Sequence, residues 1–243
     1  MCGRYILTTP LEALRHLFDF AESPNFAPRY NIAPTQSVPV LRAGESRRSL
    51  ITMRWGLIQS WAKDMSMAAR MINARAETAA DKPAFRSAFR ARRCLVPADG
   101  YFEWLKEGAH RQPYRVTRAD GAPMAFAGLW ECWKARADSG GKNPVDAGEL
   151  VETFTIITTA ASASVATLHD RMPAMIGSGD FETWLTAPAE EAAALQALLQ
   201  PARDAFTITR VSTRVNAVRN DDPECIAPDD APSGDSAPGE LPL

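Results

Sequence analysis

Hydrophobic and polar positions along the chain predict more strands than helices. Strands are predicted over 37–42 and 50–57, flanking a polar hairpin at 43–49. Alternating or β-branched runs predict further strands at 94–97, 101–105, 114–117, 124–133, 153–159 and 206–211. Helical spacing is found at 11–18, where Thr9 and Pro10 suggest a cap and a first turn, and at 84–93, 162–169 and 187–199. Because the helices do not alternate regularly with the strands, we predict an α+β fold with a curved, largely antiparallel sheet and peripheral helices.

The same pattern places the folded part of the chain in one domain, residues 2–228. No linker divides it, although the cluster of Ser, Gly, Asn and Pro at 135–148 predicts a loop between two strands. Residues 229–243 are rich in Pro, Asp, Ser, Gly and Ala. Such a segment buries too little apolar surface to offset its ordering entropy, so we predict a disordered acidic tail.

Composition narrows the class of protein. The chain has 243 residues, of which 46% are hydrophobic and 23% are charged, as in ordinary globular proteins. Collagens, coiled coils and disulfide miniproteins are excluded. No apolar run reaches about 18 residues and no signal peptide is visible, so we expect no membrane span and a cytoplasmic location. The four Cys lack metal or disulfide spacing and there are three His, so we expect no metal site and no cofactor.

The net charge of −2 conceals an asymmetry along the chain. Residues 221–243 contain seven acids and no base, so residues 1–220 carry 27 bases against 22 acids. Arg outnumbers Lys by 22 to 5, and the planar guanidinium suits phosphate groups. Codon bias in a GC-rich genome explains the same excess, so composition alone leaves both explanations open.

The start of the chain offers distinctive chemistry. Met1 precedes a small residue and is therefore expected to be removed, which leaves Cys2 as the first residue. Its α-amine has a pKa of about 7.7–8.0, so part of it is neutral near pH 7. An amine adds to an aldehyde to give a Schiff base, and the neighbouring thiol can then close a thiazolidine ring. An ordinary second residue without a role is the simpler alternative.

Three other motifs carry candidate groups, each with a purely structural alternative. Asn73 could orient an amine or carbonyl and Arg75 a phosphate, or the pair could form a loop-to-helix cap. Glu103 lies among aromatic residues, where burial raises a carboxyl pKa, or it faces solvent from a half-buried strand. His169 is suited to proton transfer, or it is simply satisfied by Asp170.

Together these motifs resemble those of the SRAP family (SOS response-associated peptidase, abasic-site processing). They occur in the family's order from residue 2 to about residue 228. The sequence letters are CGRY at 2–5, RYNIAPT at 29–35, WGLI at 55–58, NARAE at 73–77, RRCLVP at 92–97, GYFEW at 100–104, FAGLW at 126–130 and HDRMP at 169–173. The resemblance implies a single domain with a barrel-like core.

The resemblance also implies a function and a set of residues. The family acts on abasic sites in single-stranded DNA, where Cys2 forms a thiazolidine DNA–protein crosslink after loss of Met1. Asn73 positions the Cys2 amine and the sugar, Glu103 shuttles protons, and His169 assists ring opening. The positions that match DNA-binding ones are Arg4, Arg75, Arg171, Asn31, Pro34, Trp55 and Trp61. The expected partner is single-stranded DNA with abasic sites, bound by a monomer that joins the nucleoid when on DNA.

Alternatives to this function stay open. Class II glutamine amidotransferases also begin Met-Cys-Gly and use the mature Cys as nucleophile, although the later motifs here follow the SRAP pattern. Cys2, Glu103 and His169 could also serve a thiol peptidase, for which release of the protein's own first residue is the expected reaction. A DNA-binding module without chemistry is the third alternative.

Overall fold

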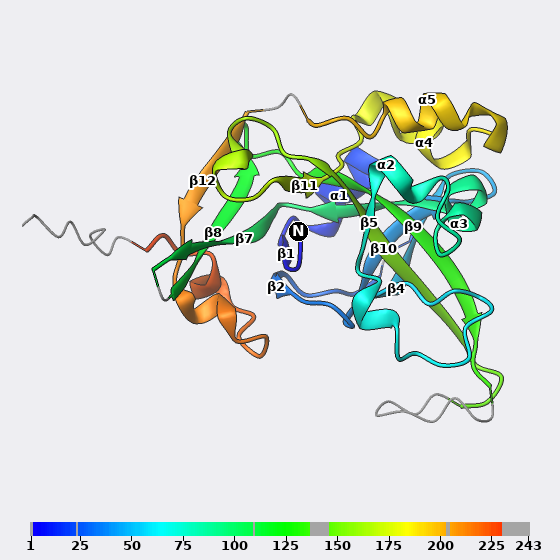
Figure 1. Cartoon of the computed structure of the whole chain (residues 1–243), viewed down its shortest axis with the longest axis horizontal. Helices are drawn as coiled ribbons and strands as arrows, with labels where there is room; N and C mark the ends of the chain where they lie inside the picture. Colours follow the sequence, from blue (N-terminus) through cyan, green and yellow to red (C-terminus); the bar gives the residue numbers. More distant parts are fainter. Residues whose placement is uncertain (1, 23, 109, 137–145, 203–204, 230–243) are drawn as a thin grey trace, which may run out of the picture.

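A computed structural model describes residues 2–22, 24–108, 110–136, 146–202 and 205–229 of the chain. Within these ranges the strands form two sheets, and short helices lie at their edges (Figure 1). The predicted α+β single domain with a barrel-like core is confirmed.

One of the two sheets closes on itself into a barrel. Its strands follow the order β10–β4–β3–β6–β9, and β9 pairs back with β10. All neighbours are antiparallel except β4 and β10, which run parallel where Thr153 pairs with Arg54. The strand bounds are β3 Ser37–Ala43, β4 Arg48–Trp55, β6 Arg93–Ala98, β9 Met124–Lys134 and β10 Leu150–Ala160. Closure pairs every strand of the barrel on both sides, which removes the unpaired edges of an open sheet.

The second sheet lies beside the barrel and holds the start of the chain. Its order is β12–β8–β7–β1–β2, with antiparallel neighbours throughout. The bounds are β1 Tyr5–Leu7, β2 Arg29–Ile32, β7 Gly100–Glu107, β8 His110–Arg118 and β12 Phe206–Arg210. Two three-residue strands, β5 Asn73–Arg75 and β11 Arg171–Pro173, add to β10. β1 lies between β7 and β2 within this sheet, near the middle of the view in Figure 1.

The helices are short and peripheral. Figure 1 shows α4 and α5 together at one edge of the molecule. The α-helices are α1 Leu11–Phe18, α2 Ala76–Ala79, α3 Arg86–Ala91, α4 Phe181–Thr186 and α5 Ala192–Ala197. Single 3₁₀ turns span η1 Ala68–Arg70, η2 Val165–Thr167, η3 Ser178–Asp180, η4 Ala189–Glu191, η5 Thr213–Asn216 and η6 Pro223–Cys225.

Two buried residues show how the barrel is packed. At Gly128 in β9, an added Cβ would lie 2.7 Å from Cys94 Sγ and 3.1 Å from the Thr155 carbonyl oxygen, so only glycine fits. Arg93 in β6 is 3% exposed and donates hydrogen bonds to the carbonyls of Phe89, Arg90, Trp184 and Ala187. Its guanidinium thereby ties α3 and the end of α4 to the barrel and satisfies carbonyls that helix ends leave unpaired.

The sequence-based elements are largely confirmed, with three corrections. The segment 162–169 is one 3₁₀ turn rather than a helix, and 187–199 is divided into η4 and α5. Thr9 does not cap α1: Pro10 occupies the N-cap position and the Thr9 hydroxyl donates to Asp99 instead. The strands β1, β2, β5 and β11 were not predicted, because three- and four-residue strands show too little alternation to be detected.

The predicted boundary between domain and tail lies at the end of the described residues. Asp229, predicted to start the tail, donates its backbone N–H to the Arg210 carbonyl. Residues 230–243 and 137–145, the rest of the tail and most of the predicted loop, lie outside the described residues. Among the described helices, none is both long and apolar enough to cross a membrane.

Candidate functional site

Cys2 is fully buried and lies three positions before the start of β1. The Asn73 side-chain N–H₂ donates to the Cys2 carbonyl at 2.7 Å, which fixes the backbone of Cys2 against β5. Burial, with a smaller effect of the nearby Glu103 charge, raises the pKa of the Cys2 thiol far above its ordinary value. The thiol is therefore held in its protonated form near neutral pH.

Glu103 approaches the same point from β7. It is 4% exposed, so of the two alternatives left open by the sequence the structure shows the buried one and not a solvent-facing carboxylate. Desolvation raises its pKa, whereas the positive charge available to His169 acts in the opposite direction. A carboxyl group whose pKa is raised toward neutrality can both donate and accept a proton there.

His169 and Arg171 come from the turn into β11. His169 Nδ1 lies 2.9 Å from the Arg171 backbone N and 2.8 Å from Asp170 Oδ1. The imidazole therefore has a backbone N–H and a carboxylate as neighbours. Glu103 interacts electrostatically with both Cys2 and His169, and Asn73 binds Cys2, so the four residues lie close together.

The arginines of the predicted site differ in what already binds them. The Arg171 guanidinium pairs with Glu77 through bonds of 2.7 and 3.0 Å and donates to the Thr158 carbonyl. Arg4 donates to Asn31 Oδ1 and the Val215 carbonyl, both at 2.8 Å. Arg75 is exposed on β5. Within the described ranges neither Arg4 nor Arg75 is paired with a carboxylate, so their positive charges remain available to an anion.

Two of the residues matched to DNA-binding positions are structural here. Trp55 is fully buried, donates to the Ile72 carbonyl at 2.9 Å and has no surface to offer DNA. The Asn31 side chain is also fully buried, and its N–H₂ donates to the carbonyls of Val215, Ala217 and Asn220. The direct DNA contact expected for Trp55 and Asn31 does not fit this burial. They support the site instead, because Trp55 anchors the residue before Asn73 and Asn31 anchors Arg4.

Trp61 and Pro34 occupy more open positions. Trp61 is 65% exposed and lines a shallow hollow with Met67, which is 43% exposed, and with Lys63 and Lys82. Pro34 is half-buried in the turn after β2. A large exposed aromatic ring with lysines beside it is suited to stacking on a base of single-stranded nucleic acid.

The structure also shows a site residue that the sequence analysis did not single out. Glu77 pairs with Arg171, and this pairing lowers the pKa of Glu77. Glu77 follows Arg75 in the motif at 73–77, and its membership of that motif is the feature by which the sequence could have identified it. An anion that approaches Arg171 must share the guanidinium with Glu77 or displace it.

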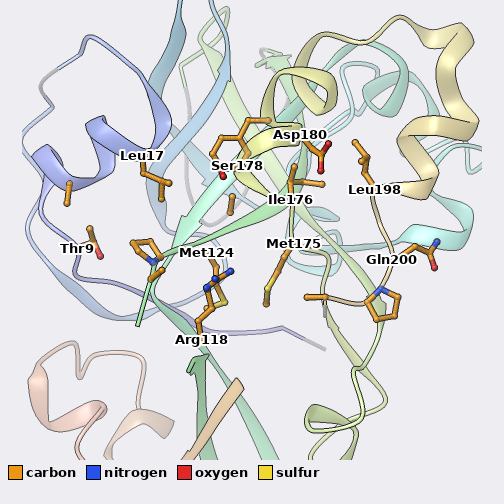
Figure 2. A pocket seen from close by; sticks show the side chains of 18 of the residues that line it. Thr9, Leu17, Arg118, Met124, Met175, Ile176, Ser178, Asp180, Leu198 and Gln200 are labelled. Atoms are coloured by element: carbon orange, nitrogen blue, oxygen red, sulfur yellow. The ribbon is translucent and has the colours of Figure 1, made fainter. Parts of the chain in front are cut away.

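A separate cavity of about 820 Å³ opens between α1, β9 and the segment 175–202. Figure 2 shows Leu17, Ile176 and Leu198 around it. Its lining does not include Cys2, Asn73, Glu103 or His169. In the described part of the chain no group of three or more His, Cys, Asp or Glu is arranged to hold a metal. Cys94 and Cys225 are buried free thiols, whereas Cys132 is half-buried.

The chain is similar to several proteins of known name. It is 35% identical over 231 residues to the abasic site processing protein YoqW of Bacillus subtilis, which covers 93% of this chain and 99% of that protein. It is 34% identical over 237 residues to the abasic site processing protein HMCES of Gallus gallus, with 84% of this chain and 67% of that protein covered. These similarities extend over nearly all of the folded residues.

Solved structures and a family match agree with these relatives. A protein of Bordetella bronchiseptica superposes with a TM-score of 0.71 at 27% identity, covering 86% of this chain and 100% of that one. A protein of Bacteroides thetaiotaomicron has the same fold, with a TM-score of 0.78 at 24% identity. Residues 1–218 match the family described as "SOS response associated peptidase (SRAP)". The chain therefore belongs to the SRAP family.

Proposed function

We propose that this protein captures abasic sites in single-stranded DNA by forming a thiazolidine between the abasic aldehyde and Cys2. Removal of Met1 would free the Cys2 α-amine. Relatives named abasic site processing proteins support the substrate class. The observation that carries the proposal is the placement of Cys2 between Asn73 and Glu103, with its carbonyl held at 2.7 Å by Asn73.

The chemistry requires two bond-forming steps at one carbon. The amine nitrogen adds to the aldehyde carbon, and Glu103 donates the proton with which the hydroxyl leaves as water. The Cys2 sulfur then adds to the resulting imine carbon. Its proton passes to the Glu103 carboxylate, which restores the acid, while the nitrogen keeps the proton of the iminium and the five-membered ring closes. His169 holds or supplies a proton at the sugar oxygen when the ring of the sugar opens.

The state of the thiol favours this order over thiol-first hydrolysis. Burial and the Glu103 charge raise the pKa of the Cys2 thiol, so little thiolate is present to attack an amide. An α-amine, with a pKa of about 7.7–8.0, is partly neutral at the same pH. The amine is thus the better first nucleophile, and the sulfur is required only after the imine has formed.

DNA would be held by charges and by stacking around the site. Arg4 and Arg75 offer positive charge that no described carboxylate neutralises, and Arg171 would bind phosphate in exchange for Glu77. Trp61 and Pro34 would contact bases or sugars beside the lesion. Such binding weakens as salt concentration rises, because phosphate neutralisation releases counterions.

The decisive experiment is a denaturing gel of the protein with single-stranded DNA that carries one abasic site. Wild type should give a covalent band without added reductant. Cys2→Ala and Cys2→Ser keep the amine but lack the thiol, so they should give a stable band only after borohydride traps the imine. A variant with leucine inserted between Met1 and Cys2 should give neither. No covalent band from wild type would overturn the proposal.

The same proteins separate the alternatives. Ammonia released from free glutamine by wild type and not by Cys2→Ala would favour the amidotransferase class. Equal protection of abasic DNA from cleavage by wild type and Cys2→Ala would favour a binding module. Intact mass should show loss of Met1, which is also the product expected of self-processing.

A further inference from the structure

Two buried hydroxyl groups lie on the Cys2 side of the second sheet without a protein partner. Tyr5 in β1 and Tyr101 in β7 are both fully buried. Neither hydroxyl forms a hydrogen bond with any group of the described chain. The side-chain oxygen of Asn73, whose amide binds Cys2, is buried in the same unsatisfied state.

The strand geometry places these groups on the face that Glu103 occupies. Tyr5 pairs directly with Tyr101 across β1 and β7, so their side chains lie on the same side of the sheet. Tyr101 and Glu103 are two positions apart in β7 and therefore share that side. Both tyrosine rings pack edge-on against Phe126, at 6.2 and 6.1 Å between centroids. Burial raises the pKa of both hydroxyls, and the nearby Cys2 sulfur adds a smaller effect in the same direction.

Unsatisfied buried polar atoms are rare in folded proteins, because each costs free energy relative to its hydrated state. Two of them on directly paired strand residues, and a third on the residue that binds Cys2, favour an occupant that can donate and accept hydrogen bonds. Water does both and typically makes about three hydrogen bonds in protein interiors. The proposed reaction also concerns water directly, since imine formation releases one molecule and crosslink reversal consumes one.

We propose that the hydroxyls of Tyr5 and Tyr101 hold ordered water beside Cys2, and that this water hydrolyses the imine when the crosslink reverses. The carbon–sulfur bond of the thiazolidine breaks first, with its electron pair on the sulfur, which takes a proton from Glu103 and leaves an iminium carbon. The water oxygen then adds to the imine carbon and gives its proton to Glu103. The carbon–nitrogen bond breaks with proton return to the amine, which restores the aldehyde and Cys2. The two tyrosines are positioning residues, because they act through the water.

The inference rests on the proposed function. Its own test uses the variants Tyr5→Phe, Tyr101→Phe and the double variant. Tyr30→Phe is the matched control, because Tyr30 packs on Ile6 and Phe102 on the other face of the same sheet. Reversal is measured by chasing preformed crosslinks with excess unlabelled abasic DNA. Since general acid–base assistance contributes about 10²–10⁴-fold, loss of the water should slow reversal at least about tenfold in the double variant. Borohydride trapping of the imine should stay close to wild type.

Two further measurements decide cases in which reversal is too slow to follow. A crystal structure of the wild type should show water within hydrogen-bond distance of both hydroxyls, and its absence there would overturn the inference. Tyr→Phe should lower Tm if a water binds the hydroxyl and raise it if the hydroxyl is truly unsatisfied. Unchanged reversal with a raised Tm would reject the water site while wild-type crosslinking still supports the proposed function. Failure of the wild type to crosslink would instead reject the function itself.

Discussion

The burial of Glu103 lowers the stability of the fold at neutral pH, and this effect can be measured separately from its proposed chemistry. Its pKa is higher in the folded chain than its ordinary value of 4.5, because burial disfavours the charged form. The folded state therefore binds this proton more tightly than the unfolded state, and ionisation of Glu103 destabilises the fold at neutral pH.

Glu103→Gln should therefore stabilise the protein while slowing it. We expect Tm to rise at pH 7, by about 2–4 °C for each kcal/mol regained in a chain of this size. The gain should shrink as pH falls through the folded pKa and vanish below 4.5, where both states are protonated. Crosslinking should slow by at least about tenfold. A lower Tm at pH 7, or an unchanged rate, would contradict this account of Glu103.

For a substitution of Asn73 we expect lower stability instead of higher, because its hydrogen bond to Cys2 both stabilises the fold and positions Cys2. Asn73→Ala removes the 2.7 Å hydrogen bond to the Cys2 carbonyl and should cost about 1 kcal/mol of unfolding free energy. Crosslinking should slow by about tenfold, since about 1.4 kcal/mol of lost alignment gives that factor. Asn25, exposed in a loop, is the control, and Asn25→Ala should leave denaturant midpoint and rate unchanged.

At the scale of single residues, the sequence predicted which side chains carry reactive groups better than it predicted where those side chains lie in the fold. Cys2, Asn73, Glu103 and His169 were named from their motifs, and the structure brings them to one place. Trp55 and Asn31 came from the same motifs but are buried. A motif does not show which side chains its backbone turns inward. That depends on hydrogen-bond partners elsewhere in the chain. Trp55 binds the Ile72 carbonyl, and Asn31 binds the Val215 carbonyl, which lies far away in the sequence.

Among the elements, the long strands of the barrel were predictable and the short strands at the site were not. β9 and β10 each contain eleven residues, enough for β-branched and apolar patterns to stand out. β5 and β11 contain three residues each and exist because β10 offers them a partner. Both short strands carry site residues, so the least predictable elements are the ones that position Asn73 and Arg171.

Packing between β6 and β9 gives a prediction for a whole element. Gly128→Ala places a Cβ 2.7 Å from Cys94 Sγ and should destabilise the barrel by about 1–3 kcal/mol through overpacking. Gly179→Ala is the matched control, because nothing lies within 4 Å of the added Cβ and its backbone is not left-handed. Urea unfolding should show a lower midpoint for the first variant only. Equal midpoints would show that β6 and β9 can separate without cost.

Across the whole molecule, acids near the end of the chain pair with bases of the domain. Asp221 accepts hydrogen bonds from the backbone N–H groups of Tyr30 and Asn31 and pairs with Arg29. Asp222 pairs with Arg214 at 2.6 Å, and Asp229 lies 3.5 Å from Arg210. The acidic stretch noted in the sequence is therefore in part structural.

Removal of residues 230–243 should tighten binding to single-stranded DNA at low salt, since it deletes three acids and no base. The difference should disappear as salt rises, because screening weakens long-range repulsion. Fluorescence anisotropy at two salt concentrations measures it. A full-length control with these acids changed to amides should match the truncation. If the truncation tightens binding and the amide variant does not, the volume of the tail is responsible and not its charge. Equal affinity of all three proteins would show that the tail does not affect DNA binding.

The sequence distance between Arg4 and its partners has a consequence for the timing of synthesis. Arg4 bonds to the Val215 carbonyl across 211 positions, and Cys2 meets Asn73 across 71. As the chain leaves the ribosome, its first residues therefore emerge before their partners have been synthesised. The proposed removal of Met1 falls within this interval, while Cys2 is still accessible to a processing enzyme. Arg4 gains its Val215 partner only when the last turns are complete, so under the proposed function we expect removal of Met1 to precede the final fixing of Arg4.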